Sequence, residues 1–262
     1  METKVVAREV MPFDRSLWGE AFVPTQPPRF PCPSCYFSHG GRLTADLSDL
    51  HVEVPQRLIF SPRFRLTMRC DVALCGEVVA VAGTVGPWET EVDGKRIVHA
   101  EALYPSSFFP APPIIAASDA QDGTTGLLIE KSSELFWVEP ESCMNCVRRI
   151  IERTLDNFGV ARTHISKKGK EERIPLHVRI QHFLDTDEYV AESFGALKKI
   201  GNMGSHGEEI GRETMLDAYE LLDNCMRHLY DLSPEDSLKI KMRMSSHARI
   251  ESLRATLRDL GG

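Results

Sequence analysis

Four cysteines in two closely spaced pairs constrain the fold of this chain more than any other feature. The first pair lies in Cys32-Pro33-Ser34-Cys35, and the second lies in Cys70-Asp71-Val72-Ala73-Leu74-Cys75, which Gly76 follows directly. Structural zinc prefers four soft ligands in a closed tetrahedron, and thiolates at these spacings can supply all four. The pattern therefore predicts a structural zinc ion held by Cys32, Cys35, Cys70 and Cys75. Buried thiols without a metal are the alternative.

The sequence around these cysteines predicts a small β module. Short apolar runs at 77–83 and 96–100 are separated by glycine and proline, which is typical of short strands. A module of this kind has a small core and needs a metal to stabilise it. Pro105 and the prolines after it are expected to break regular structure, and 116–126 is expected to be a linker. We therefore expect an irregular arm at 1–31, which is rich in proline, and a zinc-ribbon-like β domain with its connector at 32–126.

Beyond the connector the apolar period becomes helical. Pro140 and Glu141 suit a helix start, and Gly159 stands where that helix would end. Apolar residues recur at helical spacing between these points: Met144, Val147, Ile151, Leu155 and Phe158. Further helices are predicted at 176–184, 188–200, 212–230 and from Ser233, with an exposed basic loop at 162–173. The predicted class is α+β, with the β module followed by an all-α helical bundle and C-terminal helix at 127–262.

Three further cysteines have a structural interpretation. Cys143 and Cys146 are three residues apart, so on a helix they share a face and can pack inward together. A second metal site or a redox pair is the alternative for these two thiols. Cys225 is interpreted as a core residue. Seven cysteines, an odd number, fit metal ligation plus buried thiols better than a disulfide framework.

Charge and hydropathy exclude some classes of function. The formal net charge of −7 argues against a uniformly basic surface that grips duplex DNA, so any contact with nucleic acid must be local. The start of the chain lacks the apolar run of a signal peptide, and no later stretch is long enough to span a bilayer. The sequence therefore predicts a cytoplasmic protein without a membrane anchor.

The glycine-rich segment 197–207 carries the candidate catalytic residues. It is predicted to turn between two helices, and it contains Asn202 and His206 close after Lys199. A histidine can act as an acid or base near neutral pH, an amide can orient a group, and a lysine can stabilise developing phosphoryl charge. These residues point to phosphodiester chemistry. The alternative is that Asn202 and His206 hydrogen-bond the turn and fix the neighbouring helices.

The run Gly201-Asn202-Met203-Gly204-Ser205-His206-Gly207 resembles the hallmark of a bacterial family of uncharacterised domains that is similar to HEPN domains, the higher eukaryote and prokaryote nucleotide-binding helical bundles. The segments 135–141 and 147–152 resemble the family's lead into its first helix and the arginine-containing stretch within that helix. The cysteine pairs and Tyr104-Pro105 also resemble parts of the family pattern.

This resemblance implies a HEPN-like bundle of four or five helices, a homodimer, and partners in bacterial defence and restriction systems. HEPN relatives that cut RNA use an arginine and a histidine separated by four to six residues, joined across a dimer cleft. In this chain Gly201 stands where the arginine of the shortest spacing would be, and only Lys199, with six residues between it and His206, can supply the cation before the histidine. A lysine lacks the planar fork of arginine, so the two are not equivalent.

The leading functional hypothesis is a defence-associated module that dimerises and binds nucleic acid or a nucleotide, with structural zinc. The candidate phosphate contacts are Lys167, Lys168, Lys170, Lys198 and Lys199. The alternative is an enzyme, a HEPN-like metal-independent RNA endonuclease that uses His206, Asn202 and Lys199.

Overall fold

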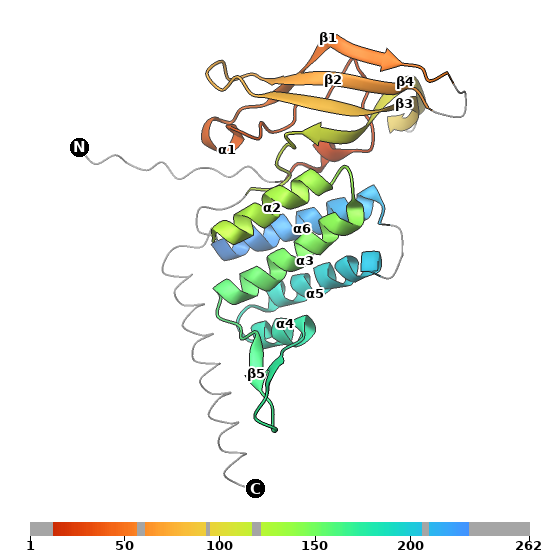
Figure 1. The fold of residues 1–262 in the computed structure, drawn as a ribbon. Coiled ribbons are helices and arrows are strands. Elements are labelled where there is room, and N and C mark those ends of the chain that lie inside the picture. Colours follow the sequence, from red (N-terminus) through yellow and green to blue (C-terminus); the bar gives the residue numbers. More distant parts are fainter. Residues whose placement is uncertain (1–12, 57–60, 93–94, 117–121, 206–209, 231–262) are drawn as a thin grey trace, which may run out of the picture. The chain divides into compact units, whose positions relative to one another are not determined.

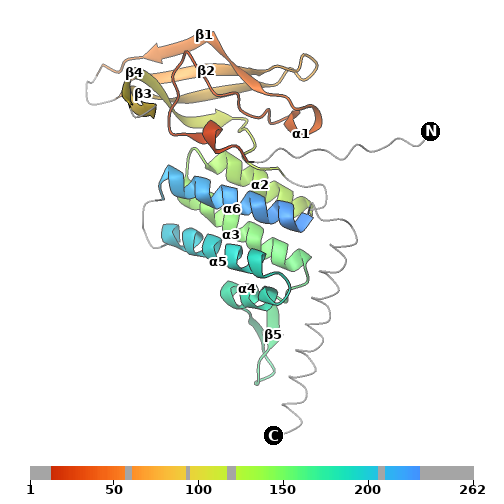
Figure 2. The ribbon, with the colours of Figure 1, turned by 180° about the vertical axis from the view of Figure 1, so that it is seen from behind.

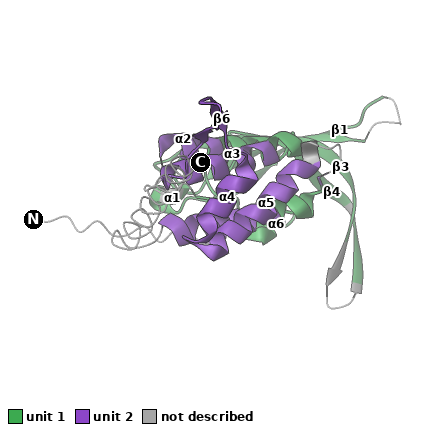
Figure 3. Ribbon diagram, turned by 90° about the horizontal axis from the view of Figure 1, so that it is seen from below, with its two compact units in different colours: residues 1–116, 130–143, 211–216 green, residues 117–129, 144–210, 217–262 purple. Residues whose placement is uncertain are grey.

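The computed structural model describes residues 13–56, 61–92, 95–116, 122–205 and 210–230. The chain forms two compact units, each assembled from separate stretches of sequence (Figure 3). Unit 1 draws on 1–116, 130–143 and 211–216, and unit 2 on 117–129, 144–210 and 217–262. The antiparallel sheet lies in the N-terminal part of the sequence and most of the helices lie in the C-terminal part, which confirms the α+β class. The predicted domain limits after residues 31 and 126 stay predictions.

A curled sheet of four antiparallel strands dominates unit 1 (Figure 1). The strands are β1 (Leu43–Glu53), β2 (Arg63–Cys70), β3 (Val78–Val92) and β4 (Lys95–Phe109), and they pair in that order. In β2, buried Phe64, Leu66 and Met68 alternate with residues on the opposite face, namely the exposed Arg63, Arg65 and Arg69 and the half-buried Thr67. The period of two places one face of the sheet on the core. Strands β3 and β4 are longer than the short runs that the sequence indicated.

Pro105 lies inside β4, so the expectation that it ends regular structure is wrong. It pairs with Gly83 where the β3–β4 register shifts. Proline is tolerated at such a bulge and on an edge strand, and β4 is the edge of this sheet. Gly83 is required for the close approach, because a Cβ there would overlap the Tyr104 carbonyl oxygen and lie 2.7 Å from Phe64 Cε1.

The part of the N-terminal arm that the structure describes, from residue 13 onward, supplies core residues. It contains a short 3-10 helix, η1 (Arg15–Trp18), and an isolated bridge between Phe22 and Leu103. Five aromatic side chains form one cluster in unit 1: Trp18, Phe30, Phe108, Phe136 and Trp137. The Arg212 guanidinium covers this cluster, 4.3 Å from the Phe136 ring centroid and 4.6 Å from that of Trp137. Burial lowers the pKa of Arg212.

The helices and a small hairpin follow in chain order. They are α2 (Gly123–Leu135), α3 (Pro140–Asn157), β5 (Thr163–Ile165), β6 (Glu171–Arg173), α4 (Leu176–Leu184), α5 (Glu188–Ser205) and α6 (Arg212–Tyr230). The predicted limits of α4 and α6 are confirmed at both ends. The apolar stripe predicted for α3 is buried, and Gly159, with φ +80°, follows the end of the helix.

Helix α2 begins inside the segment that the sequence indicated as a linker, so that prediction is wrong from residue 123 onward. Two glycines in its first turn hide the helical pattern. The side chain of Asp122 supplies the start signal, because its Oδ1 accepts a hydrogen bond from the Thr125 backbone N–H at 2.6 Å. Burial of Ile129 and of Ser132 then fixes the helix against its neighbours.

Two further predictions need correction, and one lies outside the described residues. Helix α5 continues through Ser205, so 201–205 is not a turn. Gly201 is buried in the helix and faces α3, where a Cβ would lie 3.6 Å from the Met144 carbonyl oxygen. The predicted basic loop is exposed but forms the β5–β6 hairpin beside α4 (Figure 2). The predicted helix from Ser233 lies outside the described part of the chain.

Candidate functional site

The four cysteines of the two sequence pairs converge in unit 1. Cys32 and Cys35 lie just before α1 (Tyr36–His39), whereas Cys70 ends β2 and Cys75 lies in the turn before β3. Their sulfur atoms all lie within 4.8 Å of one another. The Cys35–Cys70 sulfur distance is 3.4 Å and the Cys32–Cys75 distance is 3.7 Å. These distances are too long for disulfide bonds, and all four thiols are free.

The backbone around the thiols is shaped to bring them together. Cys32 N–H donates to the Gly41 carbonyl at 3.0 Å, and Cys70 N–H donates to the Glu77 carbonyl at 2.9 Å. Gly41 has no room for a side chain, because a Cβ there would overlap Cys35 Sγ and lie 3.0 Å from Cys70 Sγ. The Arg42 N–H donates to Asp71 Oδ1 at 2.8 Å and links the two turns. Gly76 has φ +66°, as a tight turn requires.

The ionisation of these thiols depends on burial. Burial raises the pKa of Cys32 to about 11 and also raises the pKa of Cys35. A backbone hydrogen bond at Glu77 lowers the pKa of Cys75. The Val72 N–H also donates to Cys70 Sγ at 3.4 Å. A bound cation would stabilise the thiolates against the cost of burial.

The donor set fits a tetrahedral metal ion. Metal–sulfur bonds of about 2.3 Å in a regular tetrahedron require sulfur–sulfur distances of about 3.8 Å. The two short distances given above lie near this value, and all the others are below 4.8 Å. The four cysteines can therefore hold a metal ion, and a complete thiolate shell leaves no ligand position for a substrate.

The other cysteines are core residues. Cys143 and Cys146 are 0% and 5% exposed, and Cys143 Sγ donates to the Ser132 carbonyl oxygen at 3.3 Å. Cys225 is also fully buried. In the described part of the chain, Cys32, Cys35, Cys70 and Cys75 form the one cysteine group close enough to share a metal ion.

Unit 2 contains a second candidate site, an arginine-lined pocket of about 530 Å³. Its lining combines five arginines, two carboxylates, two threonines and one leucine: Thr124, Leu128, Arg149, Glu152, Arg153, Asp156, Arg162, Thr163, Arg173 and Arg179. They come from α2, α3, the β5–β6 hairpin with the residue before it, and α4. We call this the arginine pocket.

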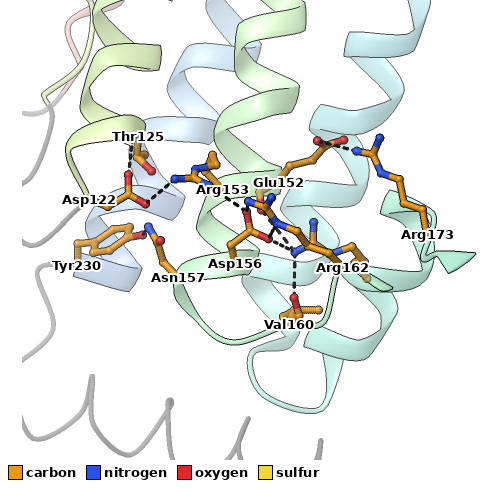
Figure 4. Close-up of polar contacts among 11 residues, drawn as sticks. Asp122, Thr125, Glu152, Arg153, Asp156, Asn157, Val160, Arg162, Arg173 and Tyr230 are labelled. Atoms are coloured by element: carbon orange, nitrogen blue, oxygen red, sulfur yellow. Dashed lines mark hydrogen bonds and ion pairs between the residues drawn. The ribbon is translucent and has the colours of Figure 1, made fainter. Parts of the chain in front are cut away.

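Asp156 is the centre of the arginine pocket, and Figure 4 shows Arg153 and Arg162 directed toward it. Arg162 binds both of its carboxylate oxygens. Arg179 Nη2 donates to Oδ1 at 2.8 Å, and Arg153 lies 3.8 Å from Oδ2. Hydrogen bonding to Asp156 raises the pKa of Arg162. One carboxylate thus orders three cations around the pocket.

A second carboxylate, Asp122, holds Arg153 from the other side at 3.8 Å. Burial alone would raise the pKa of Asp122. The Thr125 N–H, Asn157 and the charge of Arg153 outweigh burial and lower the pKa. Asp122 is therefore ionised, and it restrains Arg153 at the edge of the pocket.

Exposure within the arginine pocket forms a gradient. The side chain of Arg179 is 5% exposed, Arg153 is 33% exposed, and Arg173 is 76% exposed. Arg179 also donates to the Val160 carbonyl oxygen at 3.0 Å, and so fixes the segment after α3. The Nε atoms of Arg153 and Arg179 are buried, and neither has an acceptor among the described residues. Two of the lining arginines therefore each keep one buried N–H without an acceptor in the described residues.

The candidate catalytic residues are only partly described. His206 lies outside the described residues. Lys199 is exposed on α5, and Asn202 is half-buried on the same helix. Asn202 Oδ1 accepts a hydrogen bond from Arg148 Nη1 at 3.1 Å, and Arg148 Nε lies 3.6 Å from Glu152 Oε1. The structure thus brings Asn202 together with an arginine that the sequence analysis did not select.

Sequence signals existed for some of the missed residues. Arg149 and Arg153, and likewise Glu152 and Asp156, recur at helical spacing on α3. Arg179 stands among the buried positions of α4, between Leu176 and Ile180, where an arginine needs a partner. Arg162 and Arg173 carry no such pattern, because the hairpin brings them to the pocket.

Residues 130–255 match the sequence model of a family described as "Domain of unknown function (DUF4145)". The match covers slightly less than half of the chain and supports an uncharacterised-domain family. No curated protein and no solved structure matches the chain. Among the described residues, no helix has the length and apolar composition needed to cross a membrane.

Proposed function

We propose that the chain is a dimeric module that binds nucleic acid or a nucleotide through its helical region and is stabilised at its front by structural zinc. The observation that carries this proposal is the arginine pocket. Its lining has five arginines and two carboxylates, a formal net charge of +3 on a chain whose net charge is −7. Local positive charge on an acidic chain favours binding of a phosphate-bearing ligand.

The β5–β6 hairpin extends this positive surface. Its turn carries Lys167, Lys168 and Lys170, all exposed, and its strands run toward Arg162 and Arg173 at the pocket. Gly169, with φ +70°, and a hydrogen bond from Ser166 N–H to the Lys170 carbonyl at 2.8 Å shape the turn. A nucleic acid strand seated at the pocket could contact the hairpin lysines through its phosphates.

Zinc is the metal that we assign to the four-cysteine centre. Thiolate ligands select zinc, copper(I) or iron–sulfur chemistry, and four thiolates in a closed tetrahedron are typical of structural zinc. The ion would hold the turn at Cys32–Cys35 against the turn at Cys70–Cys75, with no part in catalysis. This proposal also includes the zinc-ribbon-like module, the HEPN-like bundle and the association with defence systems, which the resemblance given above implies. A cytoplasmic location, which the hydropathy of the sequence predicts, is part of it as well.

Binding of labelled RNA at low salt tests the proposed function. Arg149 is the best residue to change, because it is exposed and makes no hydrogen bond or ion pair within the described part of the chain. Arg149→Ala should weaken binding about fivefold to tenfold and reduce the salt dependence by about one counterion. Arg63→Ala, which also removes an exposed arginine, is the matched control and should bind as the wild type does.

The result that opposes the proposal is equally clear. If neither RNA nor mononucleotides bind at low salt, the pocket is a structural ion-pair network. If the two variants weaken binding equally, the effect belongs to the overall charge and not to the pocket.

A metal-independent RNA endonuclease is the second candidate, with His206, Asn202 and Lys199 as its residues. The contact between Arg148 and Asn202 favours it, because it places a guanidinium beside the proposed site. An arginine can hold a phosphate through two parallel hydrogen bonds, which Lys199 cannot do. In this reaction the histidine would assist attack by the ribose 2′-hydroxyl on the adjacent phosphate.

Labelled RNA incubated with the full-length protein in the presence of a chelator tests the enzyme. The proposal expects cleavage that persists in chelator and is lost in His206→Ala. Arg148→Lys keeps the charge but removes the planar fork, so it should lower cleavage by at least about tenfold. Cleavage that is unaffected by His206→Ala would refute this assignment.

The homodimer is tested separately by sedimentation at several protein concentrations. A sedimenting mass near 29.4 kDa at all of them would identify a monomer and would also remove the shared cleft that the enzyme requires.

A further inference from the structure

We propose that the arginine pocket binds a terminal phosphate monoester, either at the end of a nucleic acid strand or on a free mononucleotide. The proposal rests on the proposed function and makes it more specific. It assigns the pocket to a phosphate group with a free end, and not to a phosphodiester inside a continuous strand.

The depth of the pocket is the first argument. Arg179 is almost fully buried, whereas Arg162 and Arg173 are 57% and 76% exposed. A continuous strand that crosses the surface would contact these outer arginines. A terminal phosphate can enter the pocket with three oxygen atoms and approach the inner arginines, because no further nucleotide continues from it.

The balance of charge is the second argument. The lining carries a formal net charge of +3, and Asp122, which pairs with Arg153 at 3.8 Å, lowers it to +2. A phosphate monoester carries about −1.5 to −2 near pH 7, whereas an internal diester carries one negative charge. The monoester therefore matches the charge of the pocket more closely.

Unused donors are the third argument. The buried Nε atoms of Arg153 and Arg179 have no acceptor in the described residues. Buried donors are normally satisfied, and an unpaired one is costly. Arg149 also lines the pocket and is free of partners among the described residues. A phosphate monoester has the acceptor oxygens that such a set of donors requires.

The lining also indicates which part of the ligand is recognised. No aromatic side chain is present among the described lining residues, and Leu128 is the one apolar residue. A base would therefore find no ring on which to stack. Thr124 adds a hydroxyl group that can donate to a phosphate oxygen, whereas the Thr163 hydroxyl already donates to Glu171 Oε1 at 2.7 Å. Recognition is of the phosphate group and is independent of base identity.

Fluorescence anisotropy with the full-length protein tests the proposal. The probes are two short oligoribonucleotides of one sequence, labelled at the 3′ end, with either a 5′-phosphate or a 5′-hydroxyl. The 5′-phosphate probe should bind at least about tenfold more tightly, because each charge-assisted hydrogen bond adds roughly this factor. Competition by AMP, with adenosine and cyclic 3′,5′-AMP as controls, distinguishes the two sources of a monoester.

The variant Arg153→Lys isolates the terminal phosphate. It keeps the positive charge but removes the planar guanidinium, and its ion pairs with Asp122 and Asp156 are both 3.8 Å long, so little stability is at risk. In the variant the ratio of the two affinities should fall toward one, whatever the change in its affinity for the 5′-hydroxyl probe. Thermal unfolding of the variant checks that it is folded.

Each outcome decides one of the two proposals. Tighter binding of the 5′-phosphate probe supports a strand end, and competition by AMP without that preference supports a free nucleotide. Equal binding of both probes, reduced in Arg149→Ala and not competed by AMP, overturns the monoester proposal and retains the proposed function. No binding of any probe or of AMP overturns both.

Discussion

Replacing Arg179 with methionine is expected to lower the free energy of unfolding by about 3 kcal/mol. The side chain is 5% exposed, and its Nη2 donates to Asp156 and to the Val160 carbonyl oxygen. Methionine fills a similar volume without charge, so the loss comes mainly from the broken polar contacts. Removing one partner of a buried ion pair costs about 3–5 kcal/mol. The lower end applies because Arg162 still binds both oxygens of Asp156.

Urea unfolding, followed by circular dichroism, measures this loss. The matched control is Arg173→Met, which removes a 76% exposed arginine whose nearest carboxylate oxygen, on Glu152, is 3.3 Å away. An exposed pair of this kind contributes about 0–1 kcal/mol, so the control should change little. Combining Arg179→Met with Asp156→Asn should cost less than the sum of the two single changes.

The reasoning is refuted if Arg179→Met costs no more than the exposed control. Such a result would mean that Arg179 is not held between Asp156 and the end of α3 in solution. It would also remove the buried cation on which the depth of the arginine pocket depends.

Three other outcomes are expected. Gly201→Ala should raise the free energy of unfolding by about 0.5–1 kcal/mol, because the added Cβ makes only ordinary contacts at 3.6 and 3.7 Å within a helix. Urea unfolding measures this gain, and a loss of stability would instead favour the turn that the sequence indicated. Chelation of the wild type, or Cys70→Ser, should lower the melting temperature of a protein that contains one zinc ion per chain. A melting curve indifferent to the chelator would contradict the structural role of the metal. Burial raises the pKa of Cys225 to about 11, so the folded state retains this proton more tightly than the unfolded chain, whose thiols titrate near about 8.5. The stability that this shift contributes is complete below that pH and declines as the pH rises toward 11. Between pH 8 and pH 10.5 the free energy of unfolding should therefore fall by about 2 kcal/mol more in the wild type than in Cys225→Ala.

The sequence predicted the features that depend on local pattern. The stripe from Met144 to Phe158 is buried as its spacing indicated, because a helix that packs on one face must repeat its apolar residues at that period. Each pair of cysteines lies within one short turn, so sequence spacing alone keeps its two thiols close, and the fold then brings the two pairs together. Gly159 ends its helix for the conformational reason that favours glycine there.

Features that depend on tertiary context escaped prediction. Gly201 was interpreted as a turn residue, yet in the helix its small size serves a close approach to Met144. Pro105 was expected to end a strand, but the bulge at Gly83 accommodates it. Met144 is far from Gly201 in sequence, and Gly83 is far from Pro105. The residue type alone could therefore not show whether a glycine serves a turn or a close contact, or whether a proline ends a strand or sits at a bulge.

The candidate site shows the same division. The metal ligands were found because each pair is contiguous, whereas the arginine pocket draws on four separate segments of the chain. Arg179 was the pocket residue most easily found from the sequence, because a charged residue on a buried helix face requires a partner. That partner, Asp156, lies 23 residues earlier in the sequence, so only the fold brings the two residues together.

The aromatic cluster of unit 1 has a consequence for how this architecture can be inherited. Phe136 and Trp137 fall inside the stretch shared with the uncharacterised-domain family, whereas Trp18, Phe30 and Phe108 precede it. A gene fusion that transferred only 130–255 would carry two rings of a five-ring core and would leave their apolar faces open to water. A relative with a different N-terminal module would therefore need other apolar residues to cover Trp137. Relatives that lack this sheet should carry smaller or polar side chains at the position equivalent to Trp137.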